Sequence, residues 1–359
     1  MKEIEIYIRK LILKLYLFFK KNGPKKDSLI LTKEHKVLLV RLNKIGDALV
    51  TTHVIKYIKE YIGCEIHVLA DRKNFFIFEN DHNVDKTIIF SKDRKDISNL
   101  RSTINKSNYY AVFDLHDDVS TTVSMFIGSL KIQNKVGFDK ITNKIFTHIV
   151  PYLDPKKHHI IERYSEILDY LNIPYDKDTI GVNYQLSEDI KQYSIDEIKR
   201  LFPNNKYLVG INISAGSEAR FWGIDNFKKL ISYFSQYDVN ILLFASPNDK
   251  GKAELIVGGK NNISAEPSFD KMTGMVSQLD FLFSPDTSVV HIASAFKIPV
   301  FGIYINYMTD NVIWYPYNTE YEVIVTEKPN FNELEFETVI NKLKIFFEQN
   351  YNGKRNSEL

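Results

Sequence analysis

Short apolar runs alternate with helical patterns in two successive stretches of this chain, and this alternation limits its possible folds more than any other feature. Short apolar runs between polar loops predict buried strands, and apolar residues three or four positions apart predict helices. In the first stretch, strands are predicted at 36–40, 66–70, 86–90 and 109–114, and helices at 50–61, 93–106, 119–130 and 158–171. Strands that alternate with helices form parallel sheets through right-handed crossovers.

A second alternation follows a polar stretch that carries Pro174 and Pro203. It predicts strands at 207–213, 239–245, 280–284 and 299–304, and helices at 225–237 and 331–349. A length of 359 residues also fits two domains. We therefore predict an α/β protein whose two Rossmann-like, doubly wound domains face each other across a cleft. The expected boundaries are an N-terminal helix in 1–27, a first domain in 28–175, a connector in 176–206, a second domain in 207–330, and a C-terminal helix and tail in 331–359.

Net charge and cysteine content exclude several classes of protein. Lys and Arg number 47 against 45 Asp and Glu, which gives a net charge of +2, whereas a dedicated nucleic-acid binder carries a clear basic excess. The single cysteine, Cys64, can form neither an internal disulfide nor a cysteine metal cluster. We therefore expect a cytoplasmic protein that does not bind nucleic acid. A monomer is the expected state, although no sequence feature determines it.

The first 27 residues are basic and amphipathic. They hold eight cations and three acids, and Ile4, Ile8, Leu11, Leu15 and Phe18 recur at helical spacing until the helix ends near Asn22-Gly23-Pro24. The apolar runs are too short to span a bilayer, and no signal-peptide cleavage site follows them. Two interpretations remain open: a helix that lies on an anionic membrane surface at the inner face of the cytoplasmic membrane, or one that packs on the protein's own body.

Polar residues directly after predicted strands are the candidate ligand contacts, because parallel sheets bind ligands beyond the carboxyl ends of their strands. The first such loop is Arg41-Leu-Asn-Lys-Ile-Gly-Asp47. Gly46 permits a tight turn, and Asp47 then stands near a helix N-terminus, where an ionised carboxylate is favoured and can accept a proton from a hydroxyl. The alternative is that Asp47 only caps the helix. With Gly46 as its only glycine, the loop is no dinucleotide fingerprint.

The second loop runs from Ile213 to Gly223 and contains Ser214, Gly216, Ser217 and Arg220. Small hydroxyl residues and a glycine expose backbone amides, and an arginine fork matches phosphate oxygens, so the loop has the profile of a diphosphate clamp. The alternative is an ordinary turn with Arg220 in solvent and Trp222 as a packing anchor.

The third loop is Phe283-Ser-Pro-Asp286-Thr287-Ser288-Val-Val-His291. Free amides of Thr287 and Ser288 at a helix start would face an anion, and Asp286 is a plausible cap. His291 either donates to a phosphate or packs beneath the loop.

Other polar clusters are weaker candidates. Asp176 and Asp178 have the spacing of a metal-binding pair but lie in the connector, so we interpret them as a solvated turn. His116, Asp117 and Asp118 follow a predicted strand and are candidates for an acceptor sugar or phosphate. His158 and His159 are expected to begin a helix.

The order of the three loops is more specific than any one of them. The series Val37–Thr52, Gly210–Trp222 and Asp286–Ala293 resembles glycosyltransferase family 9, the bacterial heptosyltransferases of lipopolysaccharide core assembly. The similarity extends through Tyr110–His116 and His159–Tyr164, so it covers about residues 36–305.

The resemblance implies a GT-B fold in which the first domain binds the acceptor and the second binds an ADP-activated sugar. The family's donor is usually ADP-L-glycero-β-D-manno-heptose, transferred with inversion to a Kdo or heptose residue of the lipid A core. Asp47 matches the proposed general base, Arg220 a phosphate-contacting lysine, and Thr287 and Ser288 the amides that hold the diphosphate. Neither a metal nor a cofactor is expected.

The resulting candidate residues fall into three groups. The catalytic candidates are Asp47 and Arg220. The donor-binding candidates are Ser214, Gly216, Ser217, Asp249, Asp286, Thr287, Ser288 and His291. The acceptor-binding candidates are Arg41, Lys44, Gly46, His116 and Asp117. The chain departs from the family pattern at Ser288, Phe221 and Ala245-Ser246, all near the expected nucleotide sugar. Two rival functions are a nucleotide-dependent oxidoreductase and a catalytically silent protein that binds a nucleotide sugar.

Overall fold

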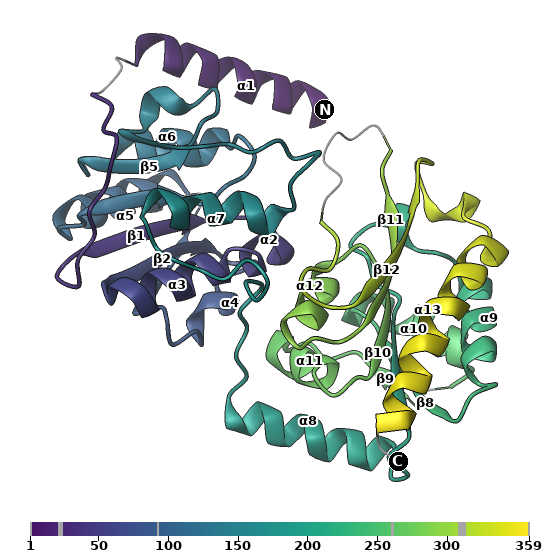
Figure 1. Ribbon diagram of the computed structural model, residues 1–359. Coiled ribbons are helices and arrows are strands. Elements are labelled where there is room, and N and C mark those ends of the chain that lie inside the picture. Colours follow the sequence, from purple (N-terminus) through teal and green to yellow (C-terminus); the bar gives the residue numbers. More distant parts are fainter. Residues whose placement is uncertain (1, 21–23, 92, 260–261, 308–313, 358–359) are drawn as a thin grey trace. The chain divides into compact units, whose positions relative to one another are not determined.

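The computed structural model describes residues 2–20, 24–91, 93–259, 262–307 and 314–357 (Figure 1). The chain divides into two compact units, unit 1 (Met1–Asn183) and unit 2 (Tyr184–Leu359). Unit 1 thus continues past residue 175 into the segment expected to be a connector. The predicted end of the first helix at Asn22-Gly23 lies outside the described residues.

Unit 1 is built on a parallel sheet with the order β3-β2-β1-β4-β5-β6. Its strands are β1 (Lys36–Arg41), β2 (Glu65–Asp71), β3 (Lys86–Phe90), β4 (Ala111–Asp114), β5 (Asn134–Phe138) and β6 (His148–Val150). Its helices are α1 (Lys2–Phe19), α2 (Ile45–Leu49), α3 (Thr52–Ile62), α4 (Phe76–Glu79), α5 (Arg94–Lys106), α6 (Thr121–Ser129), η1 (Asn143–Ile145) and α7 (Ile160–Tyr170).

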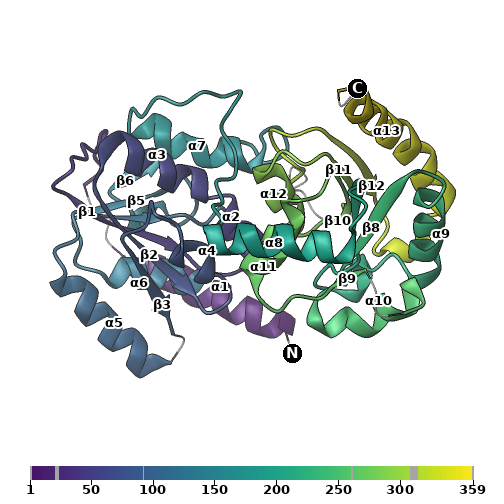
Figure 2. The same ribbon diagram turned by 90° about the horizontal axis from the view of Figure 1, so that it is seen from below.

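Unit 2 repeats this arrangement with the order β12-β11-β10-β7-β8-β9, again all parallel (Figure 2). Its strands are β7 (Tyr207–Asn212), β8 (Val239–Phe244), β9 (Ile263–Ser264), β10 (Phe281–Pro285), β11 (Val300–Ile305) and β12 (Tyr321–Thr326). Its helices are α8 (Glu188–Leu201), η2 (Glu218–Arg220), α9 (Ile224–Phe234), η3 (Pro247–Asp249), α10 (Lys250–Val257), α11 (Phe269–Val276), α12 (Ser288–Ala295), η4 (Phe331–Glu333) and α13 (Phe336–Ser357).

The predicted α/β class and the two doubly wound sheets are confirmed. In each unit the order reverses beside the first strand, between β1 and β4 and between β7 and β10. Loops that follow these strands diverge at the reversal, which leaves room for a ligand at the sheet's carboxyl edge. All three candidate loops follow one of these strands.

The sequence did not reveal β5, β6, β9 or β12, nor helix α8 inside the expected connector. Strand β5 (Asn-Lys-Val-Gly-Phe) begins with two polar residues, and β9 has only two residues, so neither forms an apolar run. Helix α8 is mostly polar and has Ser194 as its buried residue, where it packs closely on Gly274 of α11. Tertiary contacts, not local apolarity, define these elements.

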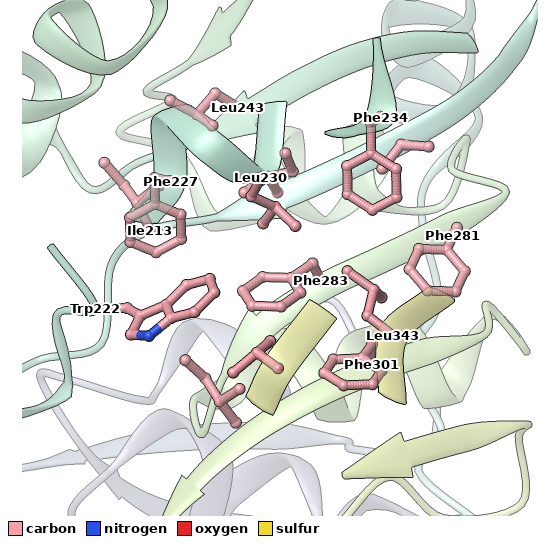
Figure 3. Packing of buried hydrophobic residues seen from close by; sticks show 14 of the residues in the cluster. Ile213, Trp222, Phe227, Leu230, Phe234, Leu243, Phe281, Phe283, Phe301 and Leu343 are labelled. Carbon is pink, nitrogen blue, oxygen red and sulfur yellow. The ribbon is translucent and has the colours of Figure 1, made fainter. Parts of the chain in front are cut away.

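An aromatic core holds unit 2 together (Figure 3). Trp222 is 1% exposed, stacks on Phe283 and donates its indole N–H to the Leu334 carbonyl at 2.9 Å. Trp222 is therefore a packing anchor, as one interpretation of the second loop predicted. Helix α13 completes this core through Val339, Leu343 and Phe347, all fully buried.

The N-terminal helix α1 belongs to unit 1. Leu13 and Leu17 are buried in one cluster with Val40 of β1 and Phe126 of α6, and Figures 1 and 2 both draw α1 beside α6. The packed interpretation is thus confirmed for this face of the helix. Among the described residues, no helix combines the length and apolarity that crossing a membrane requires.

Candidate active site

Asp47 lies in the first turn of the short helix α2, directly after β1. The N-cap of α2 is Lys44, so the interpretation of Asp47 as a helix cap is wrong. The Asp47 side chain is 24% exposed. It stands at the carboxyl edge of the sheet, where the order reverses, and one carboxylate oxygen is held by Arg41.

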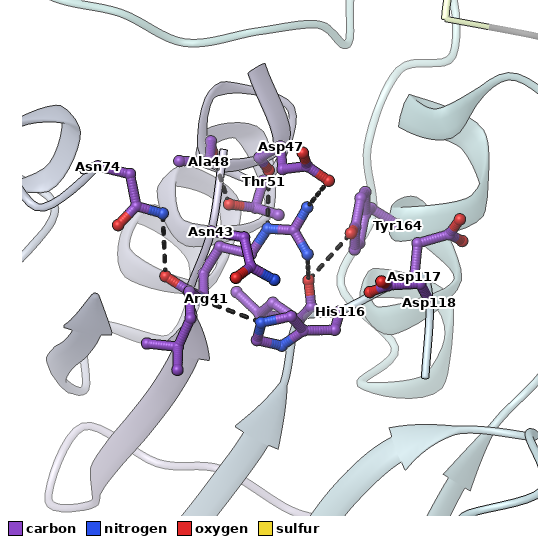
Figure 4. Close-up of polar contacts among 12 residues, drawn as sticks. Arg41, Asn43, Asp47, Ala48, Thr51, Asn74, His116, Asp117, Asp118 and Tyr164 are labelled. Carbon is purple, nitrogen blue, oxygen red and sulfur yellow. Dashed lines mark hydrogen bonds and ion pairs between the residues drawn. The ribbon is translucent and has the colours of Figure 1, made fainter. Parts of the chain in front are cut away.

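Arg41 is the last residue of β1 and forms two hydrogen bonds to residue 47 (Figure 4). Its Nη2 lies 2.5 Å from Asp47 Oδ1, its Nε donates to the Asp47 carbonyl at 2.9 Å, and its Nη1 donates to the Leu115 carbonyl at 2.7 Å. With 1% exposure, Arg41 has no open surface for a substrate. Its geometry orients the candidate base, and a contact of Arg41 with the acceptor stays a prediction.

The backbone that leads to Asp47 is held by side chains from the neighbouring strands. Leu42 N–H donates to Nε2 of His116 beyond β4, and Asn43 N–H donates to Oδ2 of Asp71 at the end of β2. Asn43 has a φ of 87°, which asparagine tolerates better than most residues. Asn74 completes the support by donating to the Arg41 carbonyl. Sequence reasoning missed Asp71 and Asn74. Asp71 could have been identified, because it stands at the end of an apolar run, just as Asp47 comes after one.

His116 is fully buried and hydrogen-bonds to this loop. Because a backbone N–H can only donate, Nε2 of His116 is the acceptor for Leu42, and its Nδ1–H donates to Asp114 at 2.7 Å. Burial alone would raise the pKa of Asp114, but Lys140 and His116 bring it below its usual value. Both ring nitrogens are thus engaged inside the fold, and an acceptor contact of His116 stays a prediction.

The remaining acceptor candidates differ in exposure. Asp117 is 8% exposed and paired with the buried Arg163 at 2.6 Å, so its carboxylate serves the fold. Lys44 is exposed, and Gly46 is half-buried in α2. Lys44, Gly46 and Asp47 are therefore the candidates of unit 1 that keep the most exposed surface, and the acceptor contacts stay predictions.

In unit 2 the third loop starts helix α12. Thr287 is its N-cap and accepts from Val289 N–H at 3.3 Å, so the prediction of Asp286 as the cap is wrong. Thr287 and Ser288 are half-buried. Helix N-termini carry unpaired amides and a partial positive charge, and both favour a bound anion.

Asn212, which sequence reasoning missed, joins the second and third loops. It is 2% exposed, and its amide nitrogen donates to Ser284 Oγ at 3.0 Å and Thr287 Oγ1 at 3.2 Å. The signal was available, because an asparagine between two isoleucines at the end of a buried strand needs polar partners. Asn212 thereby fixes the end of β7 against the start of α12.

Arg220 lies beside the same helix start. Its Nη1 is 3.1 Å from both the backbone oxygen and the carboxylate Oδ2 of Asp286, and its side chain keeps 39% exposure. The alternative of Arg220 in free solvent is therefore wrong. The ion pair places a guanidinium next to the α12 amides, where it remains partly open to solvent.

Ser214 and Asp249 bind each other. Ser214 Oγ and Ser246 Oγ both donate to Asp249 Oδ2 at 2.7 Å, which ties the loops after β7 and β8. These hydrogen bonds, set against the effect of burial, hold the pKa of Asp249 below its usual value. Gly216 adopts a left-handed φ of 66° with open space around it, and Ser217 beside it is exposed. The loop therefore presents backbone to solvent, as predicted.

His291 is buried one turn into α12. It is 3% exposed and meets Trp314 edge to face. Burial lowers the pKa of His291 to about 4, so the ring is neutral at neutral pH and brings no positive charge. His291 therefore packs beneath the loop, and its contact with the donor stays a prediction. The acidic pair of the expected connector forms an exposed turn, as interpreted from the sequence: Asp176 accepts a hydrogen bond from Asp178 N–H.

Comparison with known proteins identifies the family. The sequence model of glycosyltransferase family 9 (heptosyltransferase) matches residues 97–344. The chain belongs to glycosyltransferase family 9. As a family 9 member it is a glycosyltransferase, and the predicted resemblance is confirmed. The part that carries Asp47 precedes the matched residues.

Individual relatives agree with this assignment. A 109-residue segment is 33% identical to lipopolysaccharide heptosyltransferase 1 of Campylobacter coli, covering 29% of this chain and 31% of that protein. Lipopolysaccharide core heptosyltransferase OpsX of Haemophilus influenzae is 20% identical over 74% of this chain and 78% of its own. The structure of E. coli heptosyltransferase WaaC with ADP superimposes with a TM-score of 0.67 at 18% identity, covering 88% of this chain and 99% of that one. This family 9 protein therefore has the GT-B fold.

Proposed function

We propose that this protein transfers a heptose with inversion from ADP-heptose to a sugar of a lipopolysaccharide or lipooligosaccharide core. The observation that carries the proposal is Asp47, held by a buried arginine at the carboxyl edge of the first sheet with part of its side chain open. The names of the relatives supply the sugar and the acceptor class, and the similar WaaC structure contains ADP.

Unit 1 activates the acceptor in this proposal. The acceptor hydroxyl attacks the anomeric carbon from the face opposite the diphosphate, and Asp47 accepts its proton. Because Arg41 fixes both the backbone and one carboxylate oxygen of residue 47, the base does not have to be ordered when the acceptor binds. Lys44 and Gly46 lie on the same short segment and contact the acceptor.

Unit 2 binds the donor and stabilises the leaving group. The departing ADP gains negative charge as the glycosidic bond breaks. The amides at the start of α12 and the Arg220 guanidinium stabilise that charge, which is often the largest single contribution to catalysis. Ser214, Gly216, Ser217 and Asp249 line the adjoining loops and contact the nucleotide sugar.

We also propose that transfer needs no divalent metal, because a guanidinium and a helix N-terminus supply the positive potential that a metal would supply elsewhere. Turnover in EDTA should equal turnover in added Mg²⁺ or Mn²⁺. A strong dependence of the rate on either ion would contradict this part of the proposal.

Arg220→Gln should lower kcat/KM for the ADP-sugar by about ten- to a hundredfold, because the fork that meets the leaving diphosphate is lost. Lys228→Gln, which removes an exposed cation from α9 in the same unit, is the matched control and should leave the rate unchanged. Steady-state kinetics of both variants measure the effect. A wild-type rate for Arg220→Gln would remove Arg220 from the donor site.

ADP should raise the thermal unfolding midpoint more than UDP or GDP does. A ligand present at a hundred times its Kd stabilises the folded state by about 2.7 kcal/mol. The three nucleotides are compared at equal concentration in a thermal shift assay. Equal shifts for all three, or a shift with a nicotinamide dinucleotide alone, would overturn the donor assignment.

The silent-protein alternative predicts the same ADP shift without any transfer. Incubation with an ADP-heptose and a deacylated core acceptor, followed by mass spectrometry, separates the two. A product heavier than the acceptor by one heptosyl unit supports the enzyme, and binding without a product supports the silent protein. We propose that the reaction takes place at the cytoplasmic face of the inner membrane, where a lipid-anchored acceptor would be reached.

A further inference from the structure

Helix α1 has two opposite faces, and one of them is used by unit 1. Leu13 and Leu17 are 3% and 8% exposed, and Lys20 donates to the Gly128 carbonyl of α6 at 2.8 Å. The Tyr16 ring lies so close to Gly128 that a methyl group there would collide with it. This close fit means that α1 is seated on α6 in one fixed rotation about its own axis.

The other face is apolar and open. Its members are Tyr7, Ile8, Leu11, Ile12, Leu15, Phe18 and Phe19, with exposures from 44% for Ile12 to 78% for Phe19. At 3.6 residues per turn they cover about 140° of the helix circumference, centred opposite Leu13 and Leu17. We call this set the open face. Single exposed apolar residues are ordinary, but a contiguous arc on one helix marks an interaction surface.

Cations border the open face on both sides. Lys10 and Lys14 lie along one edge and Arg9 along the other, and all three are exposed. Three other cations of the basic stretch point back into unit 1: Lys20 bonds to Gly128, Lys25 to the Asn143 and Phe146 carbonyls, and Lys26 to Asn134. Among the side chains of α1 that the structure describes, Arg9, Lys10 and Lys14 are the exposed cations, and all three lie beside the apolar arc.

We propose that the open face binds the surface of an anionic phospholipid bilayer, with α1 lying in the plane of the headgroups. Apolar side chains enter the headgroup–acyl boundary while the bordering cations meet lipid phosphates, which is how amphipathic helices bind membranes. Since α1 is fixed on α6, binding would also fix the orientation of unit 1 on the membrane. The inference concerns side chains of α1, none of which is a proposed catalytic residue, and it does not rest on the proposed reaction.

Vesicle sedimentation of the full chain tests the proposal without any sugar donor. The protein should bind vesicles of phosphatidylcholine with phosphatidylglycerol. It should bind pure phosphatidylcholine vesicles at least about tenfold more weakly, because the bordering cations need anionic lipid. Leu15→Ser combined with Phe18→Ser should weaken binding to the anionic vesicles by about tenfold or more. Both side chains are over half exposed, so the thermal unfolding midpoint should not change.

Matched variants distinguish binding through the open face from non-specific binding to vesicles. Leu255→Ser with Ile345→Ser removes two equally exposed apolar side chains from unit 2 and should leave vesicle binding unchanged. Lys10→Glu with Lys14→Glu should abolish the preference for anionic vesicles, whereas Lys199→Glu with Lys344→Glu should not. Absence of binding by the unmodified protein would overturn the proposal, as would undiminished binding by the serine variant. A dimer that the serine variant converts to a monomer, without vesicle binding, would assign the open face to a second copy instead.

Discussion

Replacing Asp47 with asparagine should lower kcat by about 10²–10⁴-fold while the protein remains folded. Asparagine has the same shape but cannot accept the proton of the attacking hydroxyl. The side chain is partly exposed, so the change does not create a cavity. The ADP-induced thermal shift should persist, because the proposed nucleotide contacts lie in unit 2. Single-turnover kinetics with a saturating donor give the rate of the chemical step.

Asp225→Asn is the matched control for Asp47. Asp225 is an exposed carboxylate that lies in the first turn of α9, as Asp47 lies in the first turn of α2. Its neutralisation removes only a favourable interaction with the helix dipole, about 0.3–1 kcal/mol of stability, and should leave kcat unchanged. If Asp47→Asn kept more than about a tenth of the wild-type rate, a general base contributing 10²-fold or more would be excluded.

Replacing Arg41 with lysine should lower kcat by about 10²-fold, with a smaller effect on KM for the donor. Lysine keeps the charge, but it has one nitrogen in place of the three that Arg41 uses. That nitrogen cannot take all three positions from which Arg41 bonds to the Asp47 backbone oxygen, Asp47 Oδ1 and the Leu115 carbonyl. Asp47 would then occupy several positions. Arg41→Met should in addition lower the free energy of unfolding by about 3 kcal/mol, because it leaves a half-buried carboxylate without its partner.

A second variant distinguishes positioning from stability. Lys135 is also buried in unit 1 and donates to a backbone carbonyl, that of Leu130, at 2.6 Å. Lys135→Met removes this bond on β5, two strands away from β1, and should leave the kcat of the folded protein within about twofold of the wild type. Equal losses of kcat in Arg41→Lys and Lys135→Met would show that Arg41 acts only through stability.

The sequence by itself determined the class of fold, the place of the ligand loops and the family. The runs that became β1, β7 and β10 are buried except at the first residue of β1 and of β7, and such runs have few alternatives to a parallel sheet. A loop that follows a strand of a parallel sheet must lie at its carboxyl edge. Asp47, Arg220 and the Thr287–Ser288 turn could therefore be placed at sheet edges before any tertiary contact was known.

Tertiary structure alone decided which polar side chains face inward. Arg41 and His291 lie in the same loops as exposed candidates, His116 follows another strand of the first sheet, and nothing in the local pattern of these residues separates them from the exposed ones. Their orientation depends on partners distant in sequence: Leu115 for Arg41, Leu42 for His116 and Trp314 for His291. For α1 the sequence pattern was compatible both with packing and with an open face. Contact with α6 decided which side of the helix is packed and which is open. Periodicity reports how apolar a face is, whereas burial depends on what the rest of the chain brings against it.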